Sequence, residues 1–205
     1  EALLDQFLET GDLSIEEPPF TEGSKYTPKN PYSASKAAGD HLVFSYINTY
    51  NLPLIITNCS NNYGPNQHTE KLIPLMVGKI FNEEKLPIYG DGNNIRDWLY
   101  VKDHVDAIDL ILHKGKKGET YNVGGGNELS NIELINKLIL LMDKILSRSS
   151  GYSKKLISFI KDRKGHDFRY SIDFSKLKNE LGWSPKTSFE KGLEITVESY
   201  LKGLN

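Results

Sequence analysis

Short apolar segments alternate with longer helical segments along most of this 205-residue chain. The short ones, such as LPIYG, IRDWLYV and ETYNV, are rich in β-branched and aromatic residues. This alternation predicts an α/β fold with at least some parallel strand pairing. We expect strands at 54–57, 86–90, 95–101, 119–123 and 156–160, and helices at 31–50, 71–81, 103–113, 131–146, 175–181 and 188–202.

Local sequence signals predict where two of these helices begin. Residues 11–31 contain four prolines and should form an extended surface loop. Asn30 then suits an N-cap and Pro31 suits the first helical position. Asp103 is expected to cap the helix at 103–113. The buried residues expected on the first helix are Ala37, Ala38, Leu42 and Ile47.

Composition and charge exclude several classes of protein. The chain has 25 basic and 27 acidic residues, with no block of like charge that would indicate a nucleic-acid or membrane-surface partner. Its apolar runs are too short to span a membrane. Its single cysteine, Cys59, cannot form an internal disulfide and favours a reducing compartment, so we expect a cytoplasmic protein. No Cys/His spacing predicts a metal site.

Tyr32 and Lys36 form a candidate acid/base pair. They lie four residues apart on the expected first helix, so their side chains project from one face about one turn apart. An adjacent ammonium favours the phenolate form of tyrosine, which could then remove a proton from a sugar hydroxyl. The spacing Tyr-x-x-x-Lys also arises by chance, so the pair needs further support.

A second group of residues suits a nucleoside diphosphate. Lys71, Arg96 and Arg163 could supply cationic donors to phosphates. Pro87 and Tyr89 could supply an apolar and aromatic wall for a base. Each cation taken singly could equally be a solvated surface residue.

The order of the motifs carries a family resemblance. PYSASKAAGDHL resembles the active-site helix of extended short-chain dehydrogenases, and NCSNNYGP, EKLIPL, LPIYGDG, IRDWLYVKDH, ETYNVGG and GHDFRY follow it. Together with DFSKLKNELGWSP and FEKGLEITVESYL, the series resembles the dTDP-glucose 4,6-dehydratase family from about Phe20 onward. Phe168 departs from the pattern GHDRRY, so we leave it out of the expected site.

The resemblance implies a role for each matching residue. Tyr32 would be the acid/base and Lys36 would also hold the nicotinamide ribose of NAD, with Asn62 on the nicotinamide side. Pro87 and Tyr89 would bracket the thymine. The remaining substrate contacts would be Asn61, Glu70, Lys71, Leu72, Arg96, Asn131, Arg163, His166 and Tyr170.

The resemblance also implies a fold and a reaction. The fold would be the remainder of a Rossmann-like parallel sheet, at 1–60, and a smaller mixed α/β substrate-binding part, at 61–205, with 95–127 returning to the sheet. The reaction would convert dTDP-glucose to a 4-keto-6-deoxy sugar nucleotide, for deoxysugar biosynthesis, through oxidation at C4, loss of water and hydride return. The glycine-rich NAD turn and the Thr-Asp-Glu triplet of the family have no counterpart here, so we expect this chain alone to be inactive.

Alternatives remain at this stage. An epimerase or decarboxylase of the same superfamily would keep Tyr32 and Lys36, and a non-catalytic sugar-nucleotide binding module would keep the substrate residues. Gly124–Gly126 follow an expected strand, but Leu129 stands where a dinucleotide loop needs its last glycine, so a tight connection is favoured. The family is typically dimeric, and the helix from Tyr32 to Tyr50 would be the homodimer interface.

Overall fold

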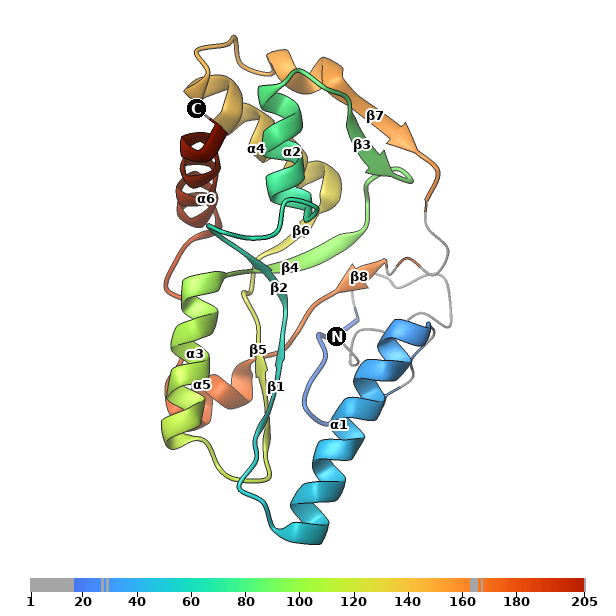
Figure 1. The fold of residues 1–205 in the computed structure, drawn as a ribbon, viewed down its shortest axis with the longest axis vertical. Coiled ribbons are helices and arrows are strands. Elements are labelled where there is room, and N and C mark those ends of the chain that lie inside the picture. Colours follow the sequence, from blue (N-terminus) through green and yellow to red (C-terminus); the bar gives the residue numbers. More distant parts are fainter. Residues whose placement is uncertain (1–16, 27, 29, 163–165, 167, 205) are drawn as a thin grey trace.

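The computed structural model describes residues 17–26, 28, 30–162, 166 and 168–204. The molecule is elongated, and its helices gather at two ends (Figure 1). One end holds α2, α4, α6 and the strands β3 and β7, and the other holds α1, α3, α5 and the strands β1 and β5. Strands β2, β4, β6 and β8 lie between the two ends. The fold is α/β, as the alternation of segments predicts.

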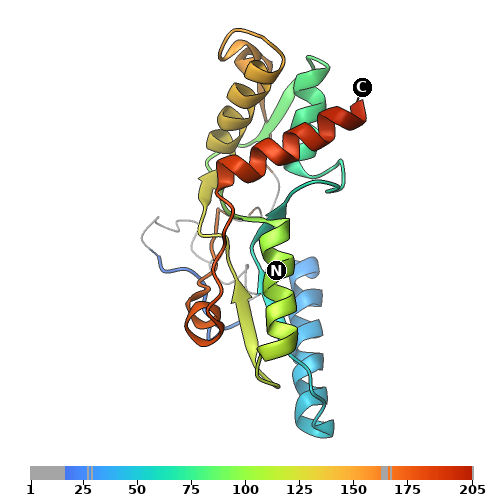
Figure 2. The same cartoon turned by 90° about the vertical axis from the view of Figure 1, so that its left-hand side faces the viewer.

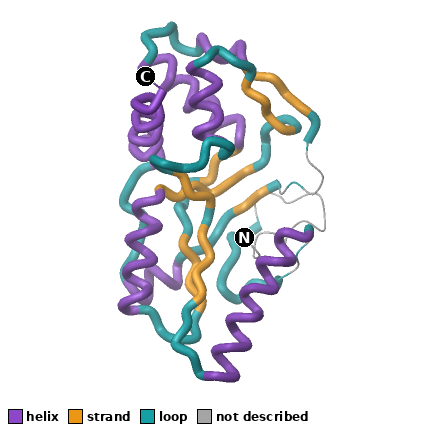
Figure 3. The backbone as a smooth tube through the Cα atoms, viewed as in Figure 1, coloured by secondary structure: helices purple, strands orange, loops and turns teal. Residues whose placement is uncertain are grey.

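The elements follow one another in the predicted order (Figure 3). The helices are α1 (Pro31–Tyr50), α2 (Leu72–Phe81), α3 (Val101–Lys114), α4 (Asn131–Ile145), α5 (Ser175–Leu181) and α6 (Phe189–Leu204), with a 3₁₀ helix, η2, at Tyr152–Leu156. The strands are β1 (Ile56–Cys59), β2 (Asn61–Tyr63), β3 (Leu86–Tyr89), β4 (Ile95–Tyr100), β5 (Thr120–Val123), β6 (Glu128–Ser130), β7 (Ile157–Ile160) and β8 (Arg169–Tyr170).

Most of the strand pairs are parallel. Strand β1 pairs in parallel with β5, β2 with β4, β3 with β7, and β8 with β4. Only the pairing of β6 with β4 is antiparallel among the named strands. Because β4 pairs with three strands, it connects the two ends of the molecule and brings segments distant in the sequence to one place.

Each end of the molecule has its own apolar cluster. One packs α2, α4 and α6 through fully buried residues such as Val77, Leu138 and Val197. The other includes Tyr121 and Leu177 and lies between the β1–β5 pair and the helices α3 and α5. These two helices lie on the same side of the pair (Figure 1), and both face the viewer in Figure 2. Each fully buried side chain of this size stabilises the fold by roughly 1.5–3 kcal/mol.

Helix α1 starts as predicted, but its burial differs from the prediction. Asn30 accepts a hydrogen bond from the Ser33 amide, and Pro31 occupies the first helical position. Ala37 is buried and Ile47 half-buried, whereas Ala38 is exposed and Leu42 is 61% exposed. The prediction for Ala38 and Leu42 was wrong because no described element covers the outer face of this helix.

Three other local predictions also need correction. Strand β1 starts two residues later than expected, and NNY in the polar segment forms strand β2, because both are set by pairing with distant strands. Asp103 does not cap α3. It is buried within the first turn and accepts a hydrogen bond of 2.9 Å from the Thr187 amide. No helix among the described residues is long and apolar enough to cross a membrane.

Candidate active site

Tyr32 and Lys36 lie on the first two turns of α1. The capped start of the helix fixes the backbone of both residues, and their four-residue spacing places them on one face. The Lys36 ammonium nitrogen lies 5.8 Å from the centre of the Tyr32 ring. Tyr32 as a whole is 57% exposed.

The pair opens onto a cavity, which we call the α1 pocket. Its volume is about 510 Å³. It lies between the first half of α1 and the strands β1 and β2. Its lining consists of Tyr32, Lys36, Asp40, Thr57, Asn58, Cys59, Ser60, Asn61, Asn62, Lys71 and Tyr170.

Amide groups shape the floor of the α1 pocket. Asn62 Nδ2 donates to Cys59 Sγ and to the Ser60 carbonyl, both at 3.2 Å, and the Tyr170 hydroxyl donates to the Cys59 carbonyl at 2.9 Å. Asn58 Nδ2 and Asn62 Oδ1 are buried and have no hydrogen-bond partner among the described residues. Because buried polar groups are nearly always satisfied, these two atoms leave capacity for a polar ligand or water.

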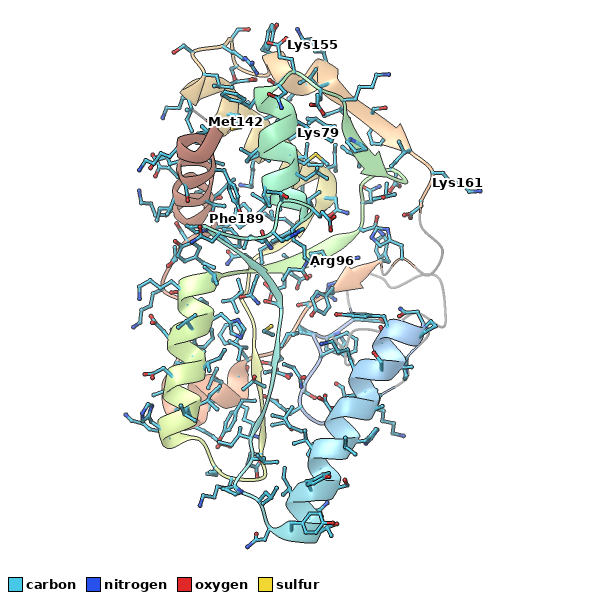
Figure 4. The ribbon with its side chains drawn as sticks, in the orientation of Figure 1. Lys79, Arg96, Met142, Lys155, Lys161 and Phe189 are labelled. Atoms are coloured by element: carbon cyan, nitrogen blue, oxygen red, sulfur yellow. The ribbon has the colours of Figure 1, made fainter. Side chains whose placement is uncertain are left out.

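A second cavity adjoins the first and shares Asn61 and Lys71 with it. This β4 pocket has a volume of about 410 Å³. It lies where β4 crosses between the two ends of the molecule, and Figure 4 labels Arg96 at this crossing. Its lining consists of Asn61, Glu70, Lys71, Leu72, Leu75, Met76, Pro87, Ile88, Tyr89, Arg96, Trp98, Asn131, Ile135 and His166.

The two pockets together gather every predicted site residue that the structure describes. Six of them line the α1 pocket and nine line the β4 pocket, with two in both. Arg163 lies outside the described residues. The individual roles implied by the resemblance stay predictions, but residues spread from position 32 to position 170 line two adjoining pockets.

Hydrogen bonds and ring contacts place the polar groups of the β4 pocket. Arg96 Nη1 donates to the Ile95 carbonyl at 2.7 Å and to the Phe168 carbonyl at 3.3 Å, which anchors the guanidinium. The Tyr89 and His166 rings meet edge to face, with centres 6.2 Å apart. The pocket therefore combines cations with an aromatic wall, as a nucleoside diphosphate requires.

Sequence reasoning missed two kinds of lining residue. The apolar wall of the β4 pocket includes Leu75 and Met76, which face the same way as Leu72 at helical spacing and so could have been found from periodicity. Asp40 lies one turn beyond Lys36 and accepts a hydrogen bond of 3.0 Å from the Tyr26 hydroxyl. Burial raises the pKa of Tyr26, and the neighbouring Asp40 carboxylate raises it further, so Tyr26 stays a donor.

The glycine run after β5 binds an internal carboxylate. The amides of Gly125 and Asn127 donate to the fully buried Asp97 at 2.8 and 2.7 Å. Burial raises the pKa of Asp97, and these hydrogen bonds oppose the rise. The run leads into β6, not directly into a helix, so it acts as a structural connection.

Comparison with known proteins places the chain in a family. The family model described as GDP-mannose 4,6 dehydratase matches residues 11–196. The chain belongs to this family. A dTDP-glucose 4,6-dehydratase from Haemophilus influenzae is 54% identical over 194 residues, which are 93% of this chain and 57% of that relative. A second, from Salmonella typhimurium, is 50% identical over 92% of this chain and 52% of the relative.

Solved structures agree with the fold and the resemblance. The crystal structure of a dTDP-glucose 4,6-dehydratase from Bacillus anthracis in complex with NAD superposes with a TM-score of 0.83 at 50% identity, covering 91% of this chain and 57% of that one. A UDP-glucose 4-epimerase from Thermotoga maritima gives a TM-score of 0.82 at 28% identity, over 94% of this chain and 60% of that one. The Rossmann-like α/β class and the resemblance to dTDP-glucose 4,6-dehydratases are confirmed. The chain spans about half the length of the curated relatives that it matches.

Proposed function

We propose that this chain carries the substrate-binding part and the Tyr-Lys pair of an NAD-dependent dTDP-glucose 4,6-dehydratase, a lyase. One observation carries the proposal: the 13 described residues that the sequence assigns to cofactor and substrate all line two adjoining pockets. The relatives at 50–54% identity with this name support the choice of reaction.

The α1 pocket fits the nicotinamide end of NAD. The Lys36 ammonium lies 5.8 Å from the centre of the Tyr32 ring, and there it would hold a ribose hydroxyl and favour the phenolate. The buried Asn62 Oδ1, which has no partner among the described residues, can accept a hydrogen bond from a carboxamide. When bound, NAD would accept hydride from C4 of the hexose and return it at C6.

The proton chemistry of the first step belongs to Tyr32. A phenolate at this position would take the proton of the C4 hydroxyl while hydride leaves the same carbon. Tyr170, whose hydroxyl is held by the Cys59 carbonyl, lies on the same pocket wall and would contact the hexose. The acids for water elimination are not assigned to any residue of this chain, so we expect the chain alone to be inactive.

The β4 pocket fits the nucleoside diphosphate. Arg96 and Lys71 would neutralise the phosphates, and the anchored guanidinium would need little reordering on binding. Pro87 and Tyr89 would bracket the base, while Asn61 and Lys71, shared by both pockets, would lie beside the sugar.

We expect Arg96→Ala to weaken dTDP binding by about 1.5–3 kcal/mol, the usual effect of losing a charge-assisted hydrogen bond. Isothermal titration calorimetry with dTDP measures the affinity, and circular dichroism checks that the variant folds. Lys102→Ala is the matched control, because the Lys102 side chain is 71% exposed and lies outside both pockets. Equal affinity for dTDP in both variants would make Arg96 an ordinary structural residue.

We keep the domain division expected from the sequence as a proposal. Residues 1–60 would belong to the NAD-binding part and 61–205 mainly to the substrate-binding part. The parallel pairing of β5 with β1 supports a return of residues 95–127 to the first part. Limited proteolysis of a full-length relative would test this division.

We also propose a homodimer through α1 and a cytoplasmic location. Leu42, Tyr46 and Tyr50 recur at four-residue spacing and are 61%, 47% and 64% exposed, which is unusual for large apolar side chains in a stripe. Sedimentation of the full-length protein should give a dimer that Tyr46→Glu dissociates; a Tyr46→Glu dimer would exclude this interface. A chain with a single cysteine, Cys59, suits a reducing compartment, and cell fractionation would test the location.

A further inference from the structure

Asp162 and His166 form a close pair beside the β4 pocket. Asp162 Oδ1 and His166 Nδ1 are 2.7 Å apart. The His166 side chain is only 7% exposed, and its ring meets the edge of Tyr89 in the pocket wall. The family resemblance assigns a ligand contact to His166 and no role to Asp162.

The Asp162 carboxylate lies close to the backbone at Gly90, which has no side chain to obstruct it. Gly90 has a positive φ of 58°, and a Cβ built on it would lie 3.2 Å from Asp162 Oδ2. The Gly90 amide donates to the Ile160 carbonyl at 2.9 Å, which extends the parallel pairing of β3 with β7. The carboxylate thus lies against a glycine whose conformation the strand pairing holds.

We infer that Asp162 is a positioning residue that fixes the tautomer of His166. A carboxylate that accepts from Nδ1–H leaves the proton on that nitrogen and an unprotonated Nε2 on the opposite edge of the ring. In the β4 pocket, Nε2 then acts as a hydrogen-bond acceptor. The group it would recognise is a donor of the nucleoside, either a ribose hydroxyl or the imide N–H of the base.

Other charged groups around the pair bear on this assignment. The cations Lys71 and Arg96 and the carboxylate of Glu70 line the same pocket, and Asp162 is the carboxylate nearest to the imidazole, so charges of both signs surround the ring. Asp91 is close enough to Asp162 for the two carboxylates to repel. The tautomer is tested at about pH 8, above the usual range of imidazole protonation, where the ring carries one proton.

The first test needs no ligand. Long-range ¹H–¹⁵N correlation spectra of the chain, with His166 assigned by a His166→Gln variant, should show a protonated Nδ1 and an unprotonated Nε2. Asp162→Ala should shift the ring toward the Nε2–H form that free imidazole prefers. A doubly protonated ring or an Nε2–H form in the parent chain would overturn the inference.

The second test measures binding and rests on the proposed function. Asp162→Ala should weaken dTDP binding roughly threefold to tenfold, the equivalent of one ordinary hydrogen bond. Asp162→Asn, which can still accept from Nδ1–H, should lose at most about twofold. Asp109→Ala is the matched control, because Asp109 and His113 form a second four-residue pair, 3.5 Å apart, that is exposed and outside both pockets.

Two modified ligands identify the donor. A dTDP analogue without the 3′-hydroxyl and one methylated at N3 of the base each remove one candidate donor. The loss of affinity caused by Asp162→Ala should disappear when the ligand is the analogue that lacks the group donating to His166 Nε2. If the parent chain binds dTDP and Asp162→Ala binds it equally well, the positioning role is wrong. If the parent chain does not bind dTDP, the proposed function fails, and the spectra still decide the tautomer.

Discussion

Tyr32→Phe should lower the rate of hexose oxidation by roughly two to four orders of magnitude, the range expected for losing a positioned acid/base. The change keeps the ring beside Lys36 and removes only the hydroxyl, so substrate binding should change little. The measurement needs a full-length enzyme, which can be made by joining residues 17–205 to the amino-terminal part of the Haemophilus influenzae relative. Single-turnover NADH formation, followed by absorbance, reports the oxidation step directly.

Tyr152→Phe is the matched control for this experiment. Tyr152 also has a lysine, Lys155, over its ring, is 37% exposed and lines neither pocket. It should leave NADH formation unchanged. If Tyr32→Phe formed NADH at nearly the parent rate, Tyr32 would not be the base, whatever the family resemblance.

Gly125→Ala should destabilise the fold by about 3 kcal/mol or more, at the upper end of the effects of overpacking. A Cβ at this position would lie 2.0 Å from the Trp98 carbonyl oxygen and 2.5 Å from its carbon, and both are backbone atoms that cannot move aside. The displaced loop would also lose the hydrogen bond from the Gly125 amide to Asp97. Urea unfolding of the chain, followed by tryptophan fluorescence, gives the free energy of unfolding.

Gly39→Ala provides the comparison. Gly39 lies in α1, and a Cβ there would meet nothing within 4 Å. Alanine is favoured over glycine within a helix by about 1 kcal/mol, so this variant should be as stable as the parent or slightly more stable. A Gly125→Ala protein that unfolds at the parent's urea concentration would contradict the close packing of this glycine run against β4.

Local chemistry explains which parts of the fold were predictable. Asn30 and Pro31 specify the start of α1 through capping, which depends only on neighbouring residues. Strand β1 was misplaced because its register is set by pairing with β5, more than 60 residues away, and not by its own apolar residues. Leu42 was expected to be buried because its spacing is helical, but spacing cannot show that its face of α1 is uncovered.

The residues of the candidate site were predicted only in part from the sequence. The motifs around Asn61, Lys71 and Arg96 suggested ligand contacts. The pairing of β2 with β4 explains how the segments of Asn61 and Arg96 come together, and Lys71 lies at the start of α2. Asp162 was not predicted, because its proposed role depends on Gly90, which follows strand β3, and on a contact with His166. Sequence motifs identify groups that touch a ligand more readily than groups that orient them.

The central claim is that this chain holds the nucleotide-sugar half of a dehydratase site and only the nicotinamide end of the NAD site. Isothermal titration calorimetry of the unmodified chain with dTDP and with NAD, in separate experiments, tests it most directly. We expect saturable binding of dTDP and clearly weaker binding of NAD. The described residues alone form the β4 pocket, whereas the α1 pocket would offer contacts to only one end of the cofactor. Tight binding of NAD without binding of dTDP would contradict it.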